Sequence, residues 1–329
     1  MSKKYEYVWL DGYTPEPTLR SKIRVGDSLT NWAFDGSSTK QATGDYSDCI
    51  LKPVAEYNNP FLKGNSKLVM CEVLLANEAS HPTNTRTKID HLSKEWWFGF
   101  EQEYFMYKNG RPLGWPAKKE PRPQGDYYCG VGAGNVAGRE IIEEHLDKCL
   151  EAGIGITGTN AEVALAQWEY QCLGKGIKAG DDLWMSRYIL LRVAEKYEVV
   201  VNFHPKPIKG DWNGSGMHTN FSNNVMRHSG TQQLMNDYCD ALEAYHEDAI
   251  KVYGSDNDQR LTGHHETQSI DEFTYGVNDR GASIVIPNIT ARDNWHGYLE
   301  DRRPASNADP YLIMKHITKT IYRSIFDKI

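Results

Sequence analysis

The segment Phe98–Phe105 (FGFEQEYF) places two glutamates, Glu101 and Glu103, two residues apart in a run of aromatic residues. Because side chains alternate between the faces of a β-strand, this spacing predicts both carboxylates on one face. Neighbouring carboxylates repel each other, and burying them unpaired is costly. Since Mg²⁺ and Mn²⁺ prefer oxygen ligands, the pair indicates a divalent metal site. Taken alone, the pair fits a solvated strand face better.

Two further glutamates, Glu162 and Glu169, lie seven residues apart in the segment Asn160–Tyr170 (NAEVALAQWEY). An odd separation would put them on opposite faces of one straight strand. A turn or bulge within Ala164–Ala166 would bring both to one side, so we expect a hairpin. Taken alone, each glutamate fits a structural or exposed role better.

An imidazole follows a glycine-rich turn in the segment Asn213–Ser222 (NGSGMHTNFS). The glycines allow the backbone to approach a ligand closely, and strand alternation places His218, Asn220 and Ser222 on one face. A lone histidine is usually a core or surface residue. Its position beside this turn makes His218 an equally good candidate for a ligand.

The C-terminal third combines one more acid with several arginines. Glu300 lies two residues before Arg302, and the simplest interpretation of that pair is a salt bridge on a solvated loop. Arg260 and Arg280 stand in the same third of the chain, and guanidinium groups pair with carboxylates and phosphates. Five carboxylates, an imidazole and several arginines together favour phosphoryl transfer onto a carboxylate. The chain has no GxxxxGK[ST] phosphate-binding loop.

The elements that would position these residues mix strands and helices. A strand-rich N-terminal region, the polar connection Asn77–Lys88 and a mixed region indicate the α+β class. Hydrophobic periodicity predicts strands over Lys4–Leu10, Leu19–Val25, Leu68–Ala76 and Val199–Phe203, the last of them buried. It predicts helices over Val136–Ala152, Leu183–Lys196 (preceded by Asp181 and Asp182), Gln232–Tyr253 and from Pro310 to the C-terminus.

Composition narrows the class of protein. The chain has 329 residues, more than a single core usually holds, so we expect two domains. A net charge of −7 argues against nucleic-acid binding, and no stretch approaches the roughly 18 apolar residues of a membrane span. Six scattered cysteines without a CxxC pair indicate reduced thiols, and no signal peptide is evident. We therefore expect a cytoplasmic protein.

Together these segments resemble the eukaryotic-type (class II) glutamine synthetase family. The matching motifs recur in the family's order across nearly the whole chain. They are FDGSST (Phe34–Thr39), WFGFEQEY (Trp97–Tyr104), YYCGVGAG (Tyr127–Gly134), GTNAEV with QWEYQ (Gly158–Gln171), PKPIKGDWNGSGMHTNFS (Pro205–Ser222), RLTGHHET (Arg260–Thr267), YGVNDRGAS (Tyr275–Ser283) and YLEDRRPASNADPY (Tyr298–Tyr311).

The resemblance implies a small N-terminal β-grasp domain, residues 1–82, and a larger catalytic domain, residues 83–329. The catalytic domain would contain a curved antiparallel sheet flanked by helices. The implied reaction is the ATP-dependent ligation of ammonia to the γ-carboxylate of glutamate through γ-glutamyl phosphate, with ATP as co-substrate and two or more Mg²⁺ or Mn²⁺ ions.

The resemblance also assigns roles to residues. One metal ion, near the glutamate, would be held by Glu103, Glu162 and Glu169. The second, near the ATP phosphates, would be held by Glu101, His218 and Glu300. The glutamate would be bound by Asn213, Gly214 and Arg260, with Glu103 and His218 beside it.

Further roles concern phosphate, nucleotide and ammonium. Arg280 and Arg302 would neutralise the phosphoryl group and contact the nucleotide, as would Ser222. Glu266 would close the site and, with Asp35, bind ammonium and remove its proton. In the family this aspartate comes from the neighbouring subunit, so the resemblance implies a homo-oligomer of stacked, decamer-like rings.

Two departures from the family qualify these expectations. Val285 stands where the family usually has a second arginine near the phosphates, which predicts weaker ATP binding unless a neighbour such as Arg292 compensates. The sequence also starts almost at its first strand, without a common N-terminal extension, so the resemblance leaves the size and stacking of the rings open. The alternatives are a ligase that joins glutamate to another amine and a non-catalytic, glutamine-synthetase-like binding protein. The presence of Asp35, Glu266 and all six metal-ligand candidates disfavours both.

Overall fold

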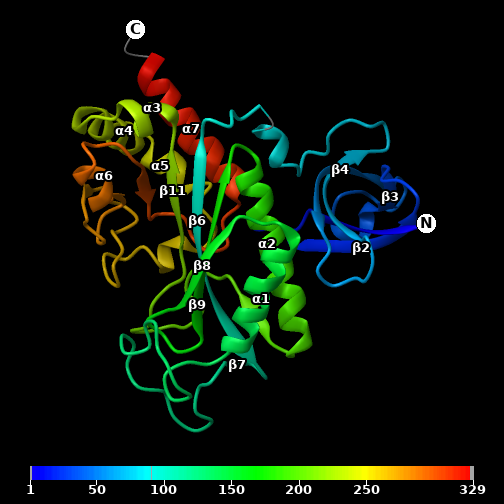
Figure 1. Cartoon of the computed structure of the whole chain (residues 1–329), viewed down its shortest axis with the longest axis horizontal. Coiled ribbons are helices and arrows are strands. Elements are labelled where there is room, and N and C mark those ends of the chain that lie inside the picture. The colour runs from blue at the N-terminus through cyan, green and yellow to red at the C-terminus, as the bar shows by residue number, and fades with distance from the viewer. Residues whose placement is uncertain (1, 90, 327–329) are drawn as a thin grey trace.

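The computed structural model describes residues 2–89 and 91–326 and contains two β-sheets, one from each half of the expected division (Figure 1). The strands are β1 (Lys3–Leu10), β2 (Leu19–Gly26), β3 (Trp32–Asp35), β4 (Asp48–Asn58), β5 (Lys67–Leu75), β6 (Trp97–Lys108), β7 (Arg111–Pro112), β8 (Ile156–Ala161), β9 (Gln167–Lys175), β10 (Val200–Asn202), β11 (Met217–Ser222), β12 (Tyr275–Val277), β13 (Ile284–Ile286) and β14 (Leu299–Asp301). The helices are α1 (Arg139–Ala152), α2 (Lys178–Lys196), α3 (Asn224–Ser229), α4 (Gln232–Ala244), α5 (His246–Ile250), α6 (Asn288–Arg292) and α7 (Pro310–Phe326), with short 3₁₀ turns at Gly36–Thr39, Arg86–Lys88 and Asn257–Gln259.

The N-terminal sheet has five strands in the order β2-β1-β5-β4-β3. The expected hairpin forms, with Leu10 opposite Leu19, whereas β1 and β5 run parallel. Alternate residues of β1, among them Tyr7 and Trp9, pack into the core of this sheet, and Val8 joins the core of the other domain. The strand is buried on both faces because the second face packs against the helices of the catalytic domain.

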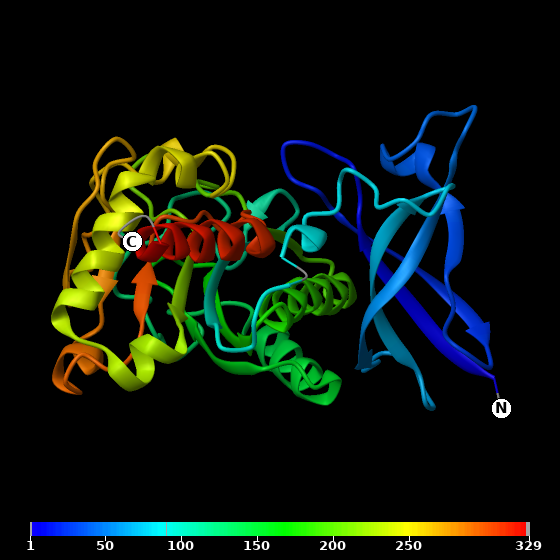
Figure 2. The same cartoon turned by 90° about the horizontal axis from the view of Figure 1, so that it is seen from above.

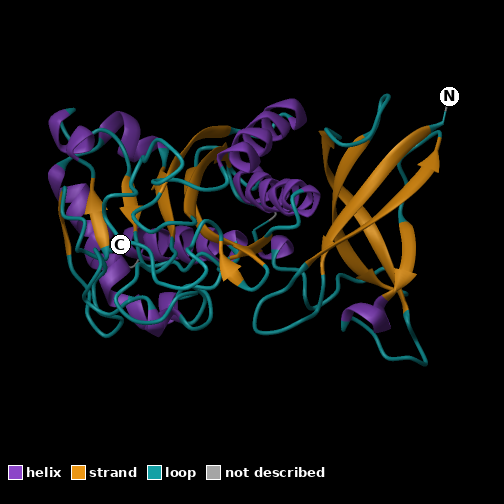
Figure 3. Cartoon of the chain, turned by 90° about the horizontal axis from the view of Figure 1, so that it is seen from below, coloured by secondary structure: helices purple, strands orange, loops and turns teal. Residues whose placement is uncertain are grey.

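The catalytic sheet has nine strands, with β6 at its centre and the path β12-β13-β14-β11-β6-β9-β8. The strands β7 and β10 pair with β6 beside this path. Helices gather around this sheet, whereas the N-terminal region is mostly strand (Figure 3). Seen from above, α7 runs across the catalytic domain, with its N-terminal end directed toward the N-terminal sheet (Figure 2).

Helix α2 lies between the two sheets (Figure 1) and ties them together through buried polar contacts. The hydroxyl of Tyr188 donates to Glu6 of β1 at 2.5 Å, and the hydroxyl of Tyr57 donates to Asp182 at 2.7 Å. Buried charges of this kind are tolerated only with such partners. The N-terminal sheet is therefore docked in a defined orientation.

Three expectations about elements were wrong in detail. Helix α2 begins at Lys178, because Asp181 and Asp182 lie inside its first turns and pair with Arg86 and Lys178 rather than capping it. The helix expected over Gln232–Tyr253 is interrupted at Tyr245, whose φ of −116° and ψ of 25° are not helical. Strand β10 is not buried, because its first residue, Val200, is 66% exposed and the other two are half-buried.

Other expectations are confirmed. Helix α1 ends at Gly153, which adopts the left-handed conformation with φ of 85° that favours glycine at this position. All six cysteines are free, and five of them are buried. Among the described residues, no helix is long and apolar enough to cross a membrane.

Candidate active site

A cavity of about 480 Å³ opens over the central strands of the catalytic sheet. Its walls come from strands β6, β9, β11 and β14 and from loops that connect the strands and helices of this domain. All but two of the expected site residues line it, namely Glu101, Glu103, Glu162, Glu169, Asn213, Gly214, His218, Arg260, Glu266, Arg280, Glu300 and Arg302. The fold thus brings together side chains that are up to about 200 positions apart in the sequence.

Three carboxylates, those of Glu103, Glu162 and Glu169, form what we call the buried cluster. Their ligand atoms lie within 4.8 Å of one another, and all three residues are buried. Glu103 and Glu169 are directly opposite each other on β6 and β9, and Glu162 follows β8 in the hairpin turn. The expected hairpin is confirmed, with Ala166 at a φ of 83° in the turn.

The electrostatics of the buried cluster are unfavourable without a cation. Burial, followed by repulsion from Glu103, raises the pKa of Glu169 to about 9. Burial is also the main cause that raises the pKa values of Glu103 and Glu162 above the usual range. Three buried carboxylates with raised pKa values are stabilised when a cation binds between them. Their oxygen atoms are suitable ligands for a hard divalent cation such as Mg²⁺ or Mn²⁺.

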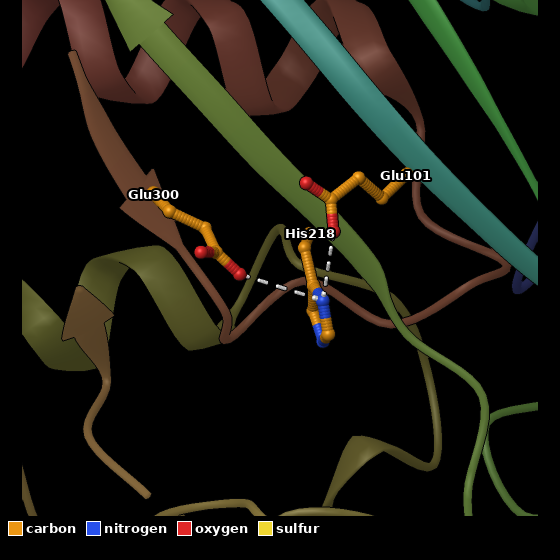
Figure 4. Close-up of side chains that lie close together, drawn as sticks. All are labelled: Glu101, His218 and Glu300. Atoms are coloured by element: carbon orange, nitrogen blue, oxygen red, sulfur yellow. Dashed lines mark ion pairs between the residues drawn. The ribbon is translucent and has the colours of Figure 1, made fainter. Parts of the chain in front are cut away.

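The second group, which we call the mixed cluster, consists of Glu101, His218 and Glu300 (Figure 4). His218 on β11 lies opposite Glu101 on β6, and its Nδ1 is 3.5 Å from Glu101 Oε2 and 3.6 Å from Glu300 Oε1. Burial, followed by the charge of Arg302, lowers the pKa of His218 well below its usual value. The imidazole is therefore neutral at pH 7, as a metal ligand must be, and two carboxylates with one imidazole also fit a divalent cation.

The arginines surround the two clusters. Arg302 donates to Glu300 Oε1 at 2.8 Å, so the expected salt bridge is present but largely buried within the site. Its Nε has no partner among the described residues, although it is buried. Arg260 is fully enclosed, and its guanidinium donates to the carbonyl oxygens of Arg302 and Arg303 at 3.0 and 3.3 Å.

The glycines of the NGSG turn are explained by Arg260. A Cβ at Gly214 would lie 2.8 Å from Arg260 Cγ, and a Cβ at Gly216 would collide with its guanidinium. The turn also supplies a donor, since the Gly216 N–H donates to Glu103 Oε2 at 2.7 Å. The expected close approach of backbone occurs here, but to an arginine of the same chain.

The segment around Glu266 covers the cavity. His265 and Glu266 both have positive φ, at 55° and 58°, and the Glu266 carbonyl accepts from Arg302 at 3.3 Å. The His265 ring lies 3.1 Å from Gln124 Nε2 and 3.2 Å from Asp211 Oδ1. This segment is therefore held by contacts with two other loops.

Sequence reasoning did not single out six of the lining residues, of which three, Gln124, Tyr128 and His265, have amide or ring side chains. Two of them belong to the irregular segment between β7 and α1, where no periodicity indicates direction. The third precedes Glu266 in HHET, and proximity to that residue was the only available signal.

Comparison with known proteins agrees with this geometry. Residues 1–76 match the sequence model described as the glutamine synthetase β-grasp domain, and residues 84–254 match the one described as the glutamine synthetase catalytic domain. The chain is 52% identical to glutamine synthetase of Bradyrhizobium diazoefficiens, over 97% of this chain and 96% of that protein. It is 50% identical to glutamine synthetase of Schizosaccharomyces pombe, over 96% of this chain and 91% of the relative.

The chain belongs to the glutamine synthetase family. The fold agrees with that of a solved member, the glutamine synthetase of Plasmodium falciparum, with a TM-score of 0.80 at 17% identity. That match covers 99% of this chain and 73% of the other. The expected fold class, a β-grasp domain followed by a catalytic domain with a curled sheet and helices, is confirmed.

A second cavity of about 440 Å³ shares Glu101 with the first and lies on the other side of that residue. Ser222 lines it, and the Ser222 hydroxyl accepts a hydrogen bond from Arg227 at 2.8 Å. Aromatic and apolar side chains, including Trp97 and Tyr298, form much of its wall. In this family member the two cavities therefore meet at the mixed cluster.

Asp35 lies in neither cavity. It ends β3 on the N-terminal sheet, is exposed, and accepts hydrogen bonds from Ser37 and Ser38, which lower its pKa. Within one chain Asp35 is not brought to Glu266, which lines the first cavity. Val285 is buried on β13 directly opposite Glu300, whereas Arg292 is exposed on α6 and lines neither cavity.

Proposed function

We propose that this member of the glutamine synthetase family is a glutamate–ammonia ligase that makes glutamine, ADP and phosphate from glutamate, ammonia and ATP. The observation that carries the proposal is the pairing of two metal-ligand clusters with three arginines around one cavity. Such an arrangement suits phosphoryl transfer to a carboxylate, which needs charge neutralisation and positioning more than covalent help.

The metal ions are part of the proposal. The buried cluster would hold one Mg²⁺ or Mn²⁺ and the mixed cluster the other, because both donor sets suit hard divalent cations. Cations bound there would offset phosphate charge and polarise the carboxylate. The remaining work falls to the side chains of the chain itself.

In the first step, a γ-carboxylate oxygen of glutamate attacks the γ-phosphorus of ATP, an O–P bond forms, and ADP leaves. Asn213, Gly214 and Arg260 would bind the glutamate, with Glu103 and His218 beside it, because all five line the same cavity. Arg280 and Arg302 would face the transferred group and its nucleotide, and Ser222 would contact the nucleotide from the second cavity.

In the second step, ammonia attacks the γ-carbonyl carbon, a C–N bond forms, and phosphate leaves. A carboxylate beside ammonium attracts the cation and accepts its proton, which is the role we propose for Glu266 and Asp35. The segment that carries Glu266 would keep water from the acyl phosphate. Since Asp35 lies outside both cavities, the site would be completed by Asp35 of a second copy.

The proposed assembly is accordingly a homo-oligomer of stacked, decamer-like rings, in which the N-terminal domain of one copy faces the catalytic domain of the next. We keep the domain boundary between residues 82 and 83, in the connection that follows β5, as a proposal. The proposed compartment is the cytoplasm, in keeping with six free cysteines.

The activity is tested by phosphate release from the purified protein with ATP, Mg²⁺ and glutamate, with and without ammonium. Release that requires both, with glutamine as product, is the expected result. A parallel panel of other amines covers the nearest alternative, and release with one of these alone would reassign the substrate. Absence of turnover in a metal-loaded, assembled protein would contradict the enzyme assignment.

The shared site is tested by mixing two inactive variants, Asp35→Ala and Glu266→Ala. If each site combines Asp35 of one copy with Glu266 of the next, mixed oligomers contain some intact sites and regain part of the activity. A mixture that exchanges subunits but stays inactive would place both residues in the same copy's site.

A further inference from the structure

Two amide side chains of the β8–β9 hairpin have no role in the chemistry above, yet they contact the buried cluster. Gln171 Nε2 donates to Glu169 Oε1 and also to Asn160 Oδ1, the latter at 3.0 Å. Asn160 Nδ2 in turn donates to Glu162 Oε1 at 3.0 Å. A continuous run of hydrogen bonds therefore joins Glu169 to Glu162 through two amides.

The direction of each hydrogen bond is fixed by the chemistry of the amide. An amide carries its acceptor and its donors on opposite arms. Because Gln171 occupies the oxygen of Asn160, the NH₂ group of Asn160 must turn toward Glu162. Both carboxylates thus receive donors, and the second amide is oriented by the first.

Gly158 makes room for this arrangement. It lies opposite Gln171 in the pairing of β8 with β9, and a Cβ there would lie 2.7 Å from Gln171 Oε1. A side chain at position 158 would push the Gln171 amide away from its present place. The glycine of the GTN segment is thereby explained by a side-chain contact, since its backbone is not in the left-handed region.

Neutral amides suit a cluster that must keep its charge. A lysine or arginine at either position would hold the carboxylates but would also cancel the charge that attracts a cation. The amides hold the oxygens in place and leave that charge available. The mixed cluster differs, because Arg302 already neutralises part of it.

We propose that Asn160 and Gln171 are positioning residues, which set the separation and orientation of Glu162 and Glu169 for the divalent cation of the buried cluster. The inference rests on the proposed metal site. Hydrogen-bond partners of metal ligands commonly contribute about 10- to 100-fold to metal affinity or activity. The affinity of one ion, and not the other, is therefore the quantity to measure.

The test is calorimetric titration of the metal-free, full-length protein with Mn²⁺, without substrates. The wild type is expected to bind two ions per chain. Asn160→Ala and Gln171→Met should each lower the affinity for one ion by about 10- to 100-fold and leave the affinity for the other within about twofold of the wild type. Gly158→Ala should reproduce the effect of Gln171→Met without altering any polar group.

The run of hydrogen bonds makes a specific prediction for the double variant. If Gln171 acts on Glu162 through Asn160, the combined loss is smaller than the product of the single losses. Multiplicative losses would overturn the linked arrangement. Unchanged affinity for both ions in Asn160→Ala, Gln171→Met and Gly158→Ala would overturn the inference as a whole.

Two controls separate positioning from folding and from the proposed function. Asn220→Ala removes an amide that donates to Glu101 at 2.7 Å, so it should weaken the other ion, and Gln233→Ala on α4 should weaken neither. The three hairpin variants should melt in EDTA at the temperature of the wild type. A variant that melts at a lower temperature in EDTA as well as binding the metal more weakly would overturn the inference in favour of a structural role.

Turnover provides a second readout. Positioning variants should need more Mg²⁺ for half-maximal activity and recover most of kcat at saturating Mg²⁺, whereas a kcat that stays low would contradict the positioning role. A wild type that binds Mn²⁺ at neither cluster would remove the proposed metal site itself. A wild type that binds two ions, with hairpin variants that match it, would remove only this inference.

Discussion

The two metal-ligand clusters share one cavity and one central strand, yet they are built differently. The buried cluster consists of three buried carboxylates, and no lysine or arginine lies within ion-pair distance of them in the described part of the chain. The mixed cluster replaces one carboxylate by an imidazole and contains the guanidinium of Arg302, 2.8 Å from Glu300.

This difference predicts that the two clusters bind a divalent ion with different affinity. Like charges buried together are stable only when a cation joins them, so we expect a tightly bound ion at the buried cluster. The mixed cluster already contains a positive group and adjoins the second cavity through Glu101. We expect its ion to exchange more readily and to bind more tightly with nucleotide present.

The largest expected effect follows from removing one ligand of the buried cluster. Glu103→Gln should lower kcat/KM by about 10³-fold or more, because several kcal/mol of charge stabilisation are lost. At alkaline pH the same change removes one of three repelling carboxylates, so the metal-free protein should then melt at a higher temperature than the wild type. A variant with normal metal affinity and turnover would contradict the role of this cluster.

Substitution of a ligand of the mixed cluster should lower turnover less than substitution of Glu103. Glu101→Gln and His218→Ala are expected to lower turnover by about 10- to 100-fold and to raise the Mg²⁺ concentration needed. Melting temperatures should change little, since both residues lie at the cavity wall. Equal loss of stability and activity would favour a structural role for these two residues.

The pH dependence of stability tests the charge of the buried cluster. Glu169 has a pKa of about 9 in the folded protein against 4.5 ordinarily, so the folded state binds its proton more tightly than the unfolded state. This contribution to stability is fully present below about pH 4.5 and is lost as pH rises through about 9.

The metal-free protein should therefore melt at lower temperatures as pH rises from about 6 to 9, and the stabilisation by Mn²⁺ should grow over the same range. Scanning calorimetry in EDTA and in Mn²⁺ measures both. Glu169→Gln is the matched control, because it removes the titrating group and should flatten the slope. A slope identical to that of the wild type would assign the effect to other groups.

The smallest expected effect follows from adding a second guanidinium beside the mixed cluster. Val285 lies opposite Glu300, so Val285→Arg would add a guanidinium beside the group that Arg302 already contacts. We expect the KM for ATP to fall by about two- to fivefold, the effect of one added charge contact. Loss of turnover with an intact fold would show that the site is adapted to valine.

Local sequence patterns indicated the metal-ligand candidates, whereas their grouping into two clusters came from the family resemblance. Strand alternation placed Glu101 and Glu103 on one face, which is where they lie. Their separation into different clusters depends on the partners that β6 meets, with His218 opposite Glu101 on one side and Glu169 opposite Glu103 on the other. Pairing between distant strands is not encoded in any local pattern.

The remaining errors have similar causes. Asp181 and Asp182 are typical of a helix start, but tertiary contacts with Arg86 and Lys178 hold them inside α2. Gln124 and Tyr128 reach the cavity from an irregular loop, which carries no periodicity. The place proposed for Asp35, in the site of a second copy, has no signal in the local sequence and came from the resemblance alone.

Strand β6 contributes one glutamate to each of the two clusters. Because Glu101 and Glu103 are separated by a single residue of the extended strand β6, backbone geometry sets their Cα atoms about 7 Å apart. Loop insertions, changes in the segment around Glu266 or different assemblies leave that spacing unaltered. The residues around the two clusters can therefore vary while the spacing between Glu101 and Glu103 stays constant.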